Sequence, residues 1–171
     1  EITEQFKQIH KALNISYDRF IGTTEARHKK ACHTIWKKLD QAGAIYKAQY
    51  EGLYCVGCES FVTEEQAKSN GGVCPNHKQQ YERLSEENYF FKLSSYTEAI
   101  KEAITSNKFI VTPNTRRNEI LQMLESGLED ISISRPKEKL PWGVPVPSDS
   151  GHVMYVWFDA LINYISVLEY P

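Results

Sequence analysis

Two pairs of metal-binding residue types constrain the fold of this chain more than any other feature of its sequence. Cys55 and Cys58 form the first pair, Cys74 and His77 form the second, and fifteen residues separate the two pairs. Each pair places two ligand atoms on one side of a tight turn, which is the spacing of a tetrahedral zinc knuckle. Residues 61–72 between the pairs are mostly polar and offer no hydrophobic core. We therefore expect a structural zinc ion, since four protein ligands leave no position for a reactive water.

Two alternatives to zinc are ordinary buried cysteines and a disulfide framework. Four cysteines among 171 residues is an ordinary number, and Cys32 lies apart in a predicted helix as a small hydrophobic residue. The other three cysteines all fall in the two pairs, and the fourth residue of the pairs is a histidine. Because three is an odd number of cysteines, this set argues against a disulfide framework. Reduced thiols that hold a metal predict a cytosolic compartment.

Composition excludes some classes of partner. Hydrophobic residues make up 41% of the chain, charged residues 25%, and the net charge is −2, which is a globular balance without a strong field for nucleic acid or membrane. No apolar run approaches the ~20 residues that span a bilayer. We therefore expect no membrane and no DNA partner, and the first residues have the character of a helix rather than of a signal peptide.

Two helices are predicted before the first pair. Residues 2–13 are apolar at a helical period, with one face formed by Ile2, Phe6, Ile9 and Leu13. The second helix is predicted over residues 26–42, after a capping segment at Gly22-Thr23-Thr24. Its inward face is formed by Ala31, Ile35 and Leu39. The other face of this helix is basic, with Arg27, Lys29, Lys30, Lys37 and Lys38. Such a stripe is usually a solvated face, and the alternative is contact with a phosphate backbone.

The rest of the chain is predicted to consist of short strands and helices. Residues 45–54 alternate in polarity and predict a strand that leads into the first pair. Capping boxes at 63–66 and 95–98 predict the starts of a short helix and of a helix that runs to about residue 107. The further predicted elements are strands over 80–84, 128–134 and 152–156, an aromatic run over 88–93, helices over 115–127 and 157–168, and a proline-rich loop over 136–147.

The last predicted helix carries a second group of residues. Trp157, Ala160, Leu161 and Tyr164 fall at i, i+3, i+4 and i+7 and line one face. Asp159 lies in the first turn, where the helix dipole favours a carboxylate. Aromatic walls beside a small alanine suit a medium-sized apolar side chain. By spacing alone such a stripe is more often core, so the pattern leaves both interpretations open.

Five motifs follow one another in order along the whole chain. They are Phe20-Ile21-Gly22-Thr23-Thr24 with Arg27-His28-Lys29-Lys30, Tyr54-Cys55-Val56-Gly57-Cys58-Glu59 with Asn88-Tyr89-Phe90-Phe91, Ile131-Ser132-Ile133-Ser134-Arg135-Pro136, Trp142-Gly143-Val144-Pro145-Val146-Pro147, and Tyr155-Val156-Trp157-Phe158-Asp159-Ala160-Leu161-Ile162-Asn163-Tyr164. Together they resemble the motifs of methionyl-tRNA synthetases, and the last three resemble that family's S-x-S-R, W-G-[IV]-P-V-P and V-W-[FL]-D-A elements. The family often has Pro at the position of Leu161, and many members have Arg at that of Gly22.

The resemblance implies a class I synthetase, which activates methionine with ATP and Mg²⁺ and transfers it to its tRNA. The implied fold class is α/β: part of a Rossmann-type catalytic domain, interrupted by a small zinc-knuckle insert of short antiparallel strands and helices. By matching position, the implied methionine pocket is formed by Trp157, Ala160, Leu161 and Tyr164, and the implied orienting polar groups are Asp159 and Arg135. The expected zinc ligands are Cys55, Cys58, Cys74 and His77. The basic stripe alone motivates the hypothesis that Arg27, Lys30 and Lys37 lie near tRNA phosphates.

The implied organisation has four parts. Residues 1–43 are the entry helices at the edge of the catalytic domain, and residues 44–93 are the zinc-binding insert. Residues 94–130 are a helical return from the insert, and residues 131–171 return to the catalytic domain with the wall of the methionine pocket.

The ATP-binding signatures of class I synthetases do not occur in this sequence. It contains no H-x-G-H element, no K-M-S-K-S loop and no glycine-rich phosphate cradle. We therefore expect an internal fragment of a cytoplasmic enzyme, and we expect the 171-residue chain by itself to be inactive in aminoacylation.

Two other functions compete with this interpretation. The first is a free-standing zinc ribbon that binds RNA or protein through helix 26–42 and the tyrosine-rich strands, against which the net charge of −2 counts. The second is another class I synthetase with a zinc-bearing insert. Trp157-Phe158-Asp159-Ala160 favours methionine over valine, leucine or isoleucine, and the chain is too short for the large editing insert of those enzymes.

Overall fold

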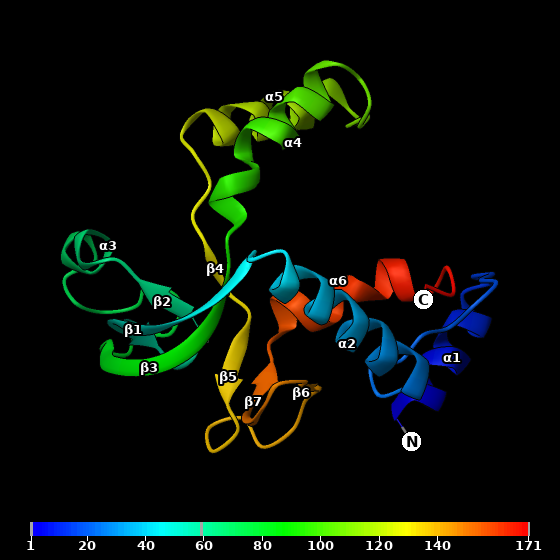
Figure 1. The fold of residues 1–171 in the computed structure, drawn as a ribbon, viewed down its shortest axis with the longest axis horizontal. Coiled ribbons are helices and arrows are strands. Elements are labelled where there is room, and N and C mark those ends of the chain that lie inside the picture. The colour runs from blue at the N-terminus through cyan, green and yellow to red at the C-terminus, as the bar shows by residue number, and fades with distance from the viewer. Residues whose placement is uncertain (1, 59, 171) are drawn as a thin grey trace.

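The computed structural model describes residues 2–58 and 60–170 and has three lobes (Figure 1). One lobe contains a four-stranded sheet and a short helix, and a helical hairpin projects away from the centre. The first, second and last helices lie together on the side away from the four-stranded sheet, next to a second sheet of three strands. Among the described residues, no helix is long and apolar enough to cross a membrane.

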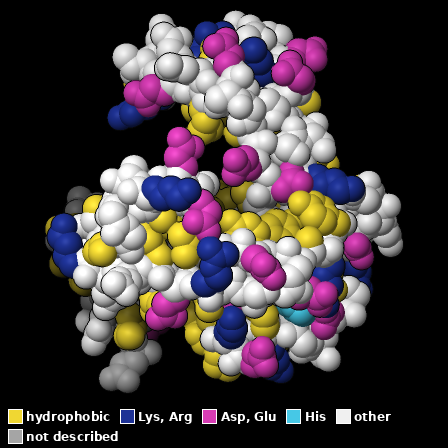
Figure 2. Space-filling view, turned by 90° about the vertical axis from the view of Figure 1, so that its left-hand side faces the viewer, with side chains coloured by type: hydrophobic (Ala, Val, Ile, Leu, Met, Phe, Trp, Pro, Cys, Tyr) yellow, Lys and Arg dark blue, Asp and Glu magenta, His cyan; other side chains and the backbone are white. Residues whose placement is uncertain are grey.

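The four-stranded sheet is antiparallel throughout, in the order β2-β1-β3-β4. Its strands are β1 (Ile45–Cys55), β2 (Ser60–Val62), β3 (Glu82–Phe91) and β4 (Ile131–Ser132). Ile45 and three tyrosines at every fourth position favour β1, which pairs with β3 from Ile45 opposite Phe91 to Tyr54 opposite Glu82. Figure 2 views the molecule from the side of this sheet and shows a band of hydrophobic side chains across the middle of that face.

One strand of this sheet is longer than the sequence predicts. β1 matches the predicted strand over 45–54 to within one residue, whereas β3 has ten residues. The predicted strand over 80–84 and the aromatic run over 88–93 are largely one strand, since pairing continues through Glu86 and Glu87. Glu86 is buried there because Lys139 lies 2.6 Å from its carboxylate and compensates the charge.

The second sheet is also antiparallel, in the order β5-β7-β6. Its strands are β5 (Ser134–Pro136), β6 (Pro145–Val146) and β7 (Asp149–Met154). The mixed α/β character of the chain is confirmed, while every strand pair among the described residues is antiparallel. β7 begins three residues before the predicted strand, because Asp149 pairs with Val146 across the turn from β6.

The hydrophobic core lies where α2 (Ala26–Gln41) and α6 (Val156–Ser166) pack together and against the second sheet. Trp36 is 1% exposed and meets the ring of Phe158 edge-on at 5.1 Å between centroids. The buried cluster consists of Ala31, Cys32, Trp36, Ile45, Ile133, Val144, Val146, Met154, Phe158 and Ile162, with Ile35 and Leu39 packed against it. The inward face predicted for the second helix is therefore confirmed.

α1 (Ile2–Ala12) contributes nothing to this core. None of its residues is buried, and its predicted apolar face is exposed, with fractions between 51% and 69% for Ile2, Phe6, Ile9 and Leu13. The helix and its apolar face were correctly predicted. Within the described chain, however, that face packs against no hydrophobic core.

Of the three predicted helix caps, one is confirmed and two are wrong. At α3 (Glu64–Ser69), the Thr63 hydroxyl accepts from the backbone of Gln66 at 3.1 Å and the Gln66 side chain accepts in return at 3.0 Å. The box predicted at 95–98 does not form, since a 3₁₀ turn, η1 (Leu93–Tyr96), occupies that segment before α4 (Thr97–Thr105). The cap expected at Gly22–Thr24 falls instead on Glu25, whose carboxylate accepts from the backbone of Gly22 at 2.8 Å.

The helical hairpin consists of α4 and α5 (Asn114–Glu125), which project together at the top of Figure 1. α5 agrees with the predicted helix over 115–127 to within two residues. Ser94 ties the base of this hairpin to the strand that returns from it, because its hydroxyl donates to Asp130 at 2.6 Å.

Candidate functional site

The four predicted metal ligands converge in the structure. Cys55 ends β1, Cys58 closes the following turn, and Cys74 and His77 lie on the loop between α3 and β3. The sulfur atoms of Cys58 and Cys74 are 3.5 Å apart, and Nδ1 of His77 lies 3.3, 3.7 and 3.9 Å from the sulfurs of Cys58, Cys74 and Cys55. All four cysteines of the chain are free thiols, so the structure does not support the disulfide alternative.

These separations fit a tetrahedral zinc ion. An ion about 2.3 Å from each sulfur and about 2.0–2.1 Å from the nitrogen requires ligand atoms about 3.5–3.8 Å apart. Cys55 and Cys74 are buried and His77 is exposed, so the site lies at the edge of the lobe with its sulfurs turned inward. With four protein donors the site is complete, and a zinc ion there would hold the turn after β1 to the loop before β3.

The electrostatics of the cluster favour a bound cation. The backbone N–H of His77 donates toward the sulfur of Cys74 and lowers the pKa of this thiol to about 6, while the neighbouring Cys74 and Cys55 sulfurs raise the pKa of Cys58 to about 11. One thiolate therefore forms readily, and a second negative charge beside it needs a cation. Zinc binds the thiolate form and supplies that charge.

Gly57 is required by the packing of this turn. A Cβ at position 57 would lie 2.5 Å from Cγ and Cδ2 of the His77 ring, which is closer than two carbon atoms approach. Glycine therefore lets the backbone between the first two ligands pass directly under the fourth ligand.

The structure decides which face of α6 is buried. Phe158, Ile162 and Ser166 form its buried face, whereas Trp157, Leu161 and Tyr164 are 59%, 51% and 78% exposed. Ala160 is half-buried at the boundary between the two faces. The predicted stripe is therefore not core within the described chain, and it forms an apolar aromatic wall that is open to solvent.

Asp159 points toward α2 rather than along this wall. Its Oδ1 lies 2.6 Å from Nε2 of His28 and 3.8 Å from the sulfur of Cys32, and Nδ1 of His28 lies 3.2 Å from the hydroxyl of Ser166. His28, Cys32 and Ser166 are fully buried. Burial, and then the Asp159 charge, raise the pKa of the Cys32 thiol to about 12, so this cysteine is a neutral thiol at neutral pH.

Sequence reasoning missed this cluster. The sequence predicts Cys32 to be a small hydrophobic residue and indicates no role for His28 or Ser166. The i, i+4 spacing of His28 and Cys32 was the available signal, but nothing in the sequence pairs His28 with a carboxylate 131 positions away.

Arg135, the second predicted orienting group, lies on β5 and does not meet Asp159. Its Nη1 donates to the hydroxyl of Ser132 at 2.7 Å and to the carbonyl of Ser134 at 2.8 Å, and its guanidinium lies 3.8 Å from the ring centroid of Tyr155. Tyr155 is the residue directly before α6. Arg135 thus contacts the residue before α6 from β5, whereas Asp159 belongs to the first turn of α6 and contacts α2.

Two cavities adjoin the start of α6. One, of about 430 Å³, is lined by Asp159, Ala160 and Trp142 among others. The other, of about 250 Å³, is lined by Arg135 and by Val56 of the zinc turn. Leu140 and Tyr155 line both cavities, so together they extend from the zinc lobe to the last helix.

The basic stripe of α2 is partly paired. Arg27 lies 3.5 Å from Glu25, and Lys38 contacts the hydroxyl of Tyr170. Lys30 and Lys37 are exposed and have no ion pair among residues 2–58 and 60–170. Arg27, Lys30 and Lys37 share one face of the helix, so a continuous anionic partner would reach all three.

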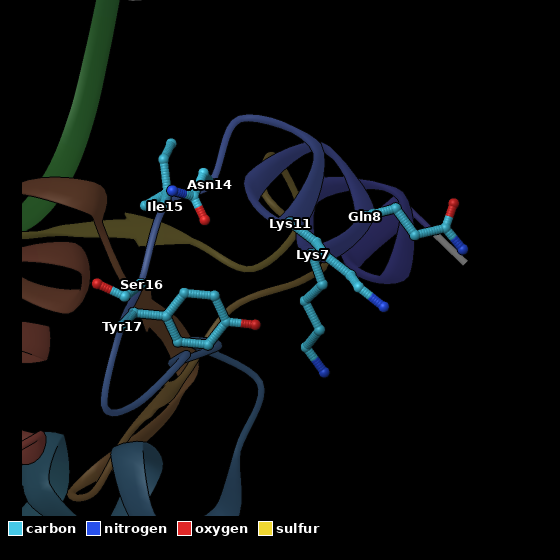
Figure 3. A pocket seen from close by; sticks show the side chains of 7 residues that line it. All are labelled: Lys7, Gln8, Lys11, Asn14, Ile15, Ser16 and Tyr17. Atoms are coloured by element: carbon cyan, nitrogen blue, oxygen red, sulfur yellow. The ribbon is translucent and has the colours of Figure 1, made fainter.

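A larger cavity, of about 580 Å³, lies beside α1 (Figure 3). Its walls come from two neighbouring segments of the chain, with Lys7 and Lys11 on the helix and Ile15 and Tyr17 on the segment after it. None of the predicted site residues lines it, and we assign it no functional role.

Comparison with known proteins covers the whole chain. The family profile described as "tRNA synthetases class I (M)" matches residues 1–86 and 78–171. The methionine–tRNA ligase of Fusobacterium nucleatum is 45% identical over 97% of this chain, and that of Clostridium perfringens is 46% identical over 99%. A crystal structure of Mycobacterium tuberculosis methionyl-tRNA synthetase bound by methionyl-adenylate is 40% identical, with a TM-score of 0.84 over 97% of this chain and 33% of that one.

The match is local within those longer proteins. The chain spans 26% of the length of the curated relatives from Fusobacterium nucleatum and Clostridium perfringens. It corresponds to 34% of the ligand-free Mycobacterium tuberculosis synthetase, with a TM-score of 0.82 and 39% identity.

Proposed function

Since this chain belongs to the class I tRNA synthetases (M), we propose that the protein of which it is part is a methionine–tRNA ligase. Such an enzyme activates methionine with ATP and Mg²⁺ and transfers it to its tRNA. The observation that carries the proposal is the exposed aromatic wall of α6, in a chain whose relatives along its whole length are methionine–tRNA ligases. A wall of this chemistry is suited to an apolar side chain rather than to solvent.

In this proposal, the methionine side chain packs against Trp157 and Tyr164, while Ala160 and Leu161 set the depth of the pocket. Methionine is unbranched and polarisable, and contacts between sulfur and aromatic rings contribute about 0.3–1.5 kcal/mol. A pocket of this kind rejects a side chain one methylene shorter by only about 1–3 kcal/mol. We therefore expect homocysteine to compete with methionine at this site.

Two polar residues, Arg135 and Asp159, hold the helix that carries this wall. Arg135 lies over Tyr155 at the start of α6, and Asp159, in the first turn of α6, contacts His28 of α2. We propose that both orient the helix. Neither is proposed to hold or move a proton in the reaction.

The zinc ion has a structural role in this proposal. Cys55, Cys58, Cys74 and His77 would hold it, and it would supply charge and cross-linking to a loop that has no core of its own. We propose that the chain has four parts. Residues 1–43 are the entry helices at the edge of the catalytic domain, residues 44–93 are the zinc-binding insert, residues 94–130 are the helical return from the insert, and residues 131–171 return to the catalytic domain. We further propose that the basic face of α2 contacts tRNA phosphates, and that the protein acts in the cytoplasm, where its thiols stay reduced.

ATP–pyrophosphate exchange by the full-length protein tests this function. We expect exchange that depends on methionine, and exchange that depends instead on leucine, valine or isoleucine would overturn the proposal. The 171-residue chain alone should give no exchange, because its sequence contains neither the H-x-G-H nor the K-M-S-K-S element.

A free-standing zinc ribbon is not favoured as an alternative. The similarity to synthetases extends past the zinc lobe through α6 to residue 171, and a ribbon that functioned alone would not need an aromatic wall on that distant helix.

A further inference from the structure

His28 is a fully buried titratable residue to which the proposed reaction assigns no role. It lies in the first turn of α2 and is 0% exposed. A buried imidazole needs a partner for each ring nitrogen. Each ring nitrogen of His28 meets a residue of α6: Asp159 lies 2.6 Å from Nε2 and Ser166 lies 3.2 Å from Nδ1.

The two contacts involve both ends of α6. Asp159 lies in its first turn and Ser166 is its last residue, seven positions later on the same face. One rigid ring therefore fixes both the rotation and the axial position of this helix. The wall of Trp157, Leu161 and Tyr164 is on the opposite side of the same helix, so it moves with any shift in the contact.

The short distance identifies the His28–Asp159 contact as a direct hydrogen bond rather than as two ligands of one metal ion. Two ligands of one metal ion at about 2.0–2.2 Å would lie about 3.3 Å or more apart. The separation of 2.6 Å is well below that, although the cluster of His28, Cys32 and Asp159 contains suitable donor types. The Cys32 thiol lies 3.2 Å from Nε2 of His28 and adds a polarisable neighbour rather than a third ligand.

The fold of this region does not depend on His28 alone. Trp36 of α2 packs against Phe158 of α6 at 5.1 Å between ring centroids, and Ala31 and Ile162 belong to the same buried cluster. These contacts are apolar and hold the two helices together through shape complementarity. The bonds of His28 add directional contacts that favour one register of α6 against α2.

We propose that His28 is a positioning residue that sets the methionine affinity of the enzyme by holding α6, through Asp159 and Ser166, in the register that places the pocket wall. The inference rests on the proposed function, because it assigns the α6 wall to methionine. A displacement of about 1 Å in a substrate-positioning element can lower the rate about 100-fold, so loss of this register should be measurable in steady-state kinetics.

The test uses the full-length enzyme with His28→Leu, which removes the donor to Asp159, and His28→Gln, whose amide N–H can replace it. In ATP–pyrophosphate exchange we expect His28→Leu to raise the KM for methionine about 10-fold or more, while the KM for ATP stays within about twofold of the original enzyme. His28→Gln should restore the methionine KM to within about threefold of the original.

His33→Leu is the matched control. His33 is on the same helix and its Nε2 lies 3.0 Å from the carbonyl of Pro145, which belongs to β6 and not to α6. We expect its methionine KM to be unchanged. An equal rise for His33→Leu and His28→Leu, or a His28→Leu enzyme with normal methionine KM and only a lower melting temperature, would overturn the positioning role.

Ser166→Ala keeps the proposal testable if His28→Leu does not fold. It removes only the weaker contact of the ring, at Nδ1, and should raise the methionine KM about threefold without affecting that for ATP. An unchanged methionine KM in that variant would contradict the proposal. Absence of methionine-dependent exchange in the original enzyme would overturn the proposed function itself, and that result is distinct from a failure of the variants alone.

Discussion

At the scale of single residues, the chain is most sensitive where a side chain or its absence sets the position of a neighbour. Gly57 allows the His77 ring to lie against the backbone of the zinc turn. Glu86 is buried because Lys139 reaches it at 2.6 Å, and Asp159 is held by His28 at the same distance. In each case the partner is distant in sequence, so the residue type alone does not indicate its role.

Replacing Gly57 by alanine tests the zinc turn. The added Cβ would displace the His77 ring, so we expect Gly57→Ala to bind zinc at least about 10-fold more weakly, by loss of one ligand. Competition with a chelator followed by elemental analysis measures this. Gly22→Ala is the control, because its Cβ would meet only ordinary contacts at 3.7 Å or more. Equal zinc affinity in both variants would show that the turn accepts a side chain.

Asp149 gives a prediction about acid stability. Burial opposes its ionisation, but hydrogen bonds from Lys47, the backbone of Gly151 and the hydroxyl of Tyr89 outweigh burial and lower the pKa of this carboxyl to about 2. A carboxyl with a lowered pKa in the folded state stabilises the protein above its unfolded pKa of about 3.9. That contribution is lost as the pH falls toward 2.

We therefore expect Asp149→Asn to lower the free energy of unfolding by up to about 2 kcal/mol at pH 7. The difference from the original protein should shrink between about pH 4 and pH 2 and then vanish. Denaturant unfolding at several pH values measures it. A difference that stays constant across this range would mean that the carboxylate charge does not contribute.

At the scale of elements, α6 shows how adjacent positions take opposite roles. Phe158 is 7% exposed and packs against Trp36, whereas its neighbour Trp157 is 59% exposed. Successive helical residues point about 100° apart, so one of them reaches the core and the other the wall. The proposed pocket therefore consists of residues that contribute little to the stability of the described chain.

Alanine substitutions at these two positions should separate stability from function. We expect Trp157→Ala in the full-length enzyme to raise the methionine KM about 10-fold or more, with a change in unfolding free energy within about 0.5 kcal/mol. Phe158→Ala should instead destabilise the protein by about 3–5 kcal/mol. Thermal melting and exchange kinetics on both variants measure this, and the opposite pattern would place Trp157 in the core.

The basic face of α2 gives a second prediction at this scale. Charge reversal at Arg27, Lys30 and Lys37 in the full-length enzyme should raise the KM for tRNA, because each residue would repel rather than attract a phosphate. Methionine activation should change little, since no hydrogen bond or ion pair joins any of the three to α6 within residues 2–58 and 60–170. The two assays, aminoacylation and ATP–pyrophosphate exchange, separate these effects, and an unchanged tRNA KM would contradict the role of this face.

At the scale of the whole molecule, β3 joins the zinc lobe to the second sheet. Its Tyr89 donates through the backbone to the hydroxyl of Ser134 at 2.8 Å, and its carbonyl accepts from the backbone of Ile133 at 2.8 Å. Lys47 of β1 lies 3.0 Å from Asp149 of β7 and strengthens the same junction. The lobe is therefore attached through its long strands, while its tip depends on the four metal ligands.

Removal of metal should act on that tip alone. We expect a chelator to lower the melting temperature and to release hydrogen-exchange protection in α3, because Ala67 is the one buried residue of that helix. Protection in α2 and α6 should persist. Uniform loss of protection across the molecule, or none at all, would contradict a local structural role for the metal.

The sequence by itself determined what depends on local spacing. The four ligands form one set because each pair needs only a tight turn, and most helices and strands followed from apolar periods and from one complete capping box. The family resemblance was also readable, since its motifs are short and occur in order. These features involve residues that are close along the chain, where sterics and periodicity act directly.

The tertiary structure alone decided which residues face each other across long separations. It showed that the stripe of α6 is exposed, that β3 continues through two glutamates, and that His28 binds Asp159 and Ser166. Each result depends on a partner that lies far along the chain: Lys139 compensates Glu86 at a separation of 53 positions, and His28 meets Asp159 at 131. Burial and charge pairing depend on which elements pack together, and no local pattern in the sequence encodes that arrangement.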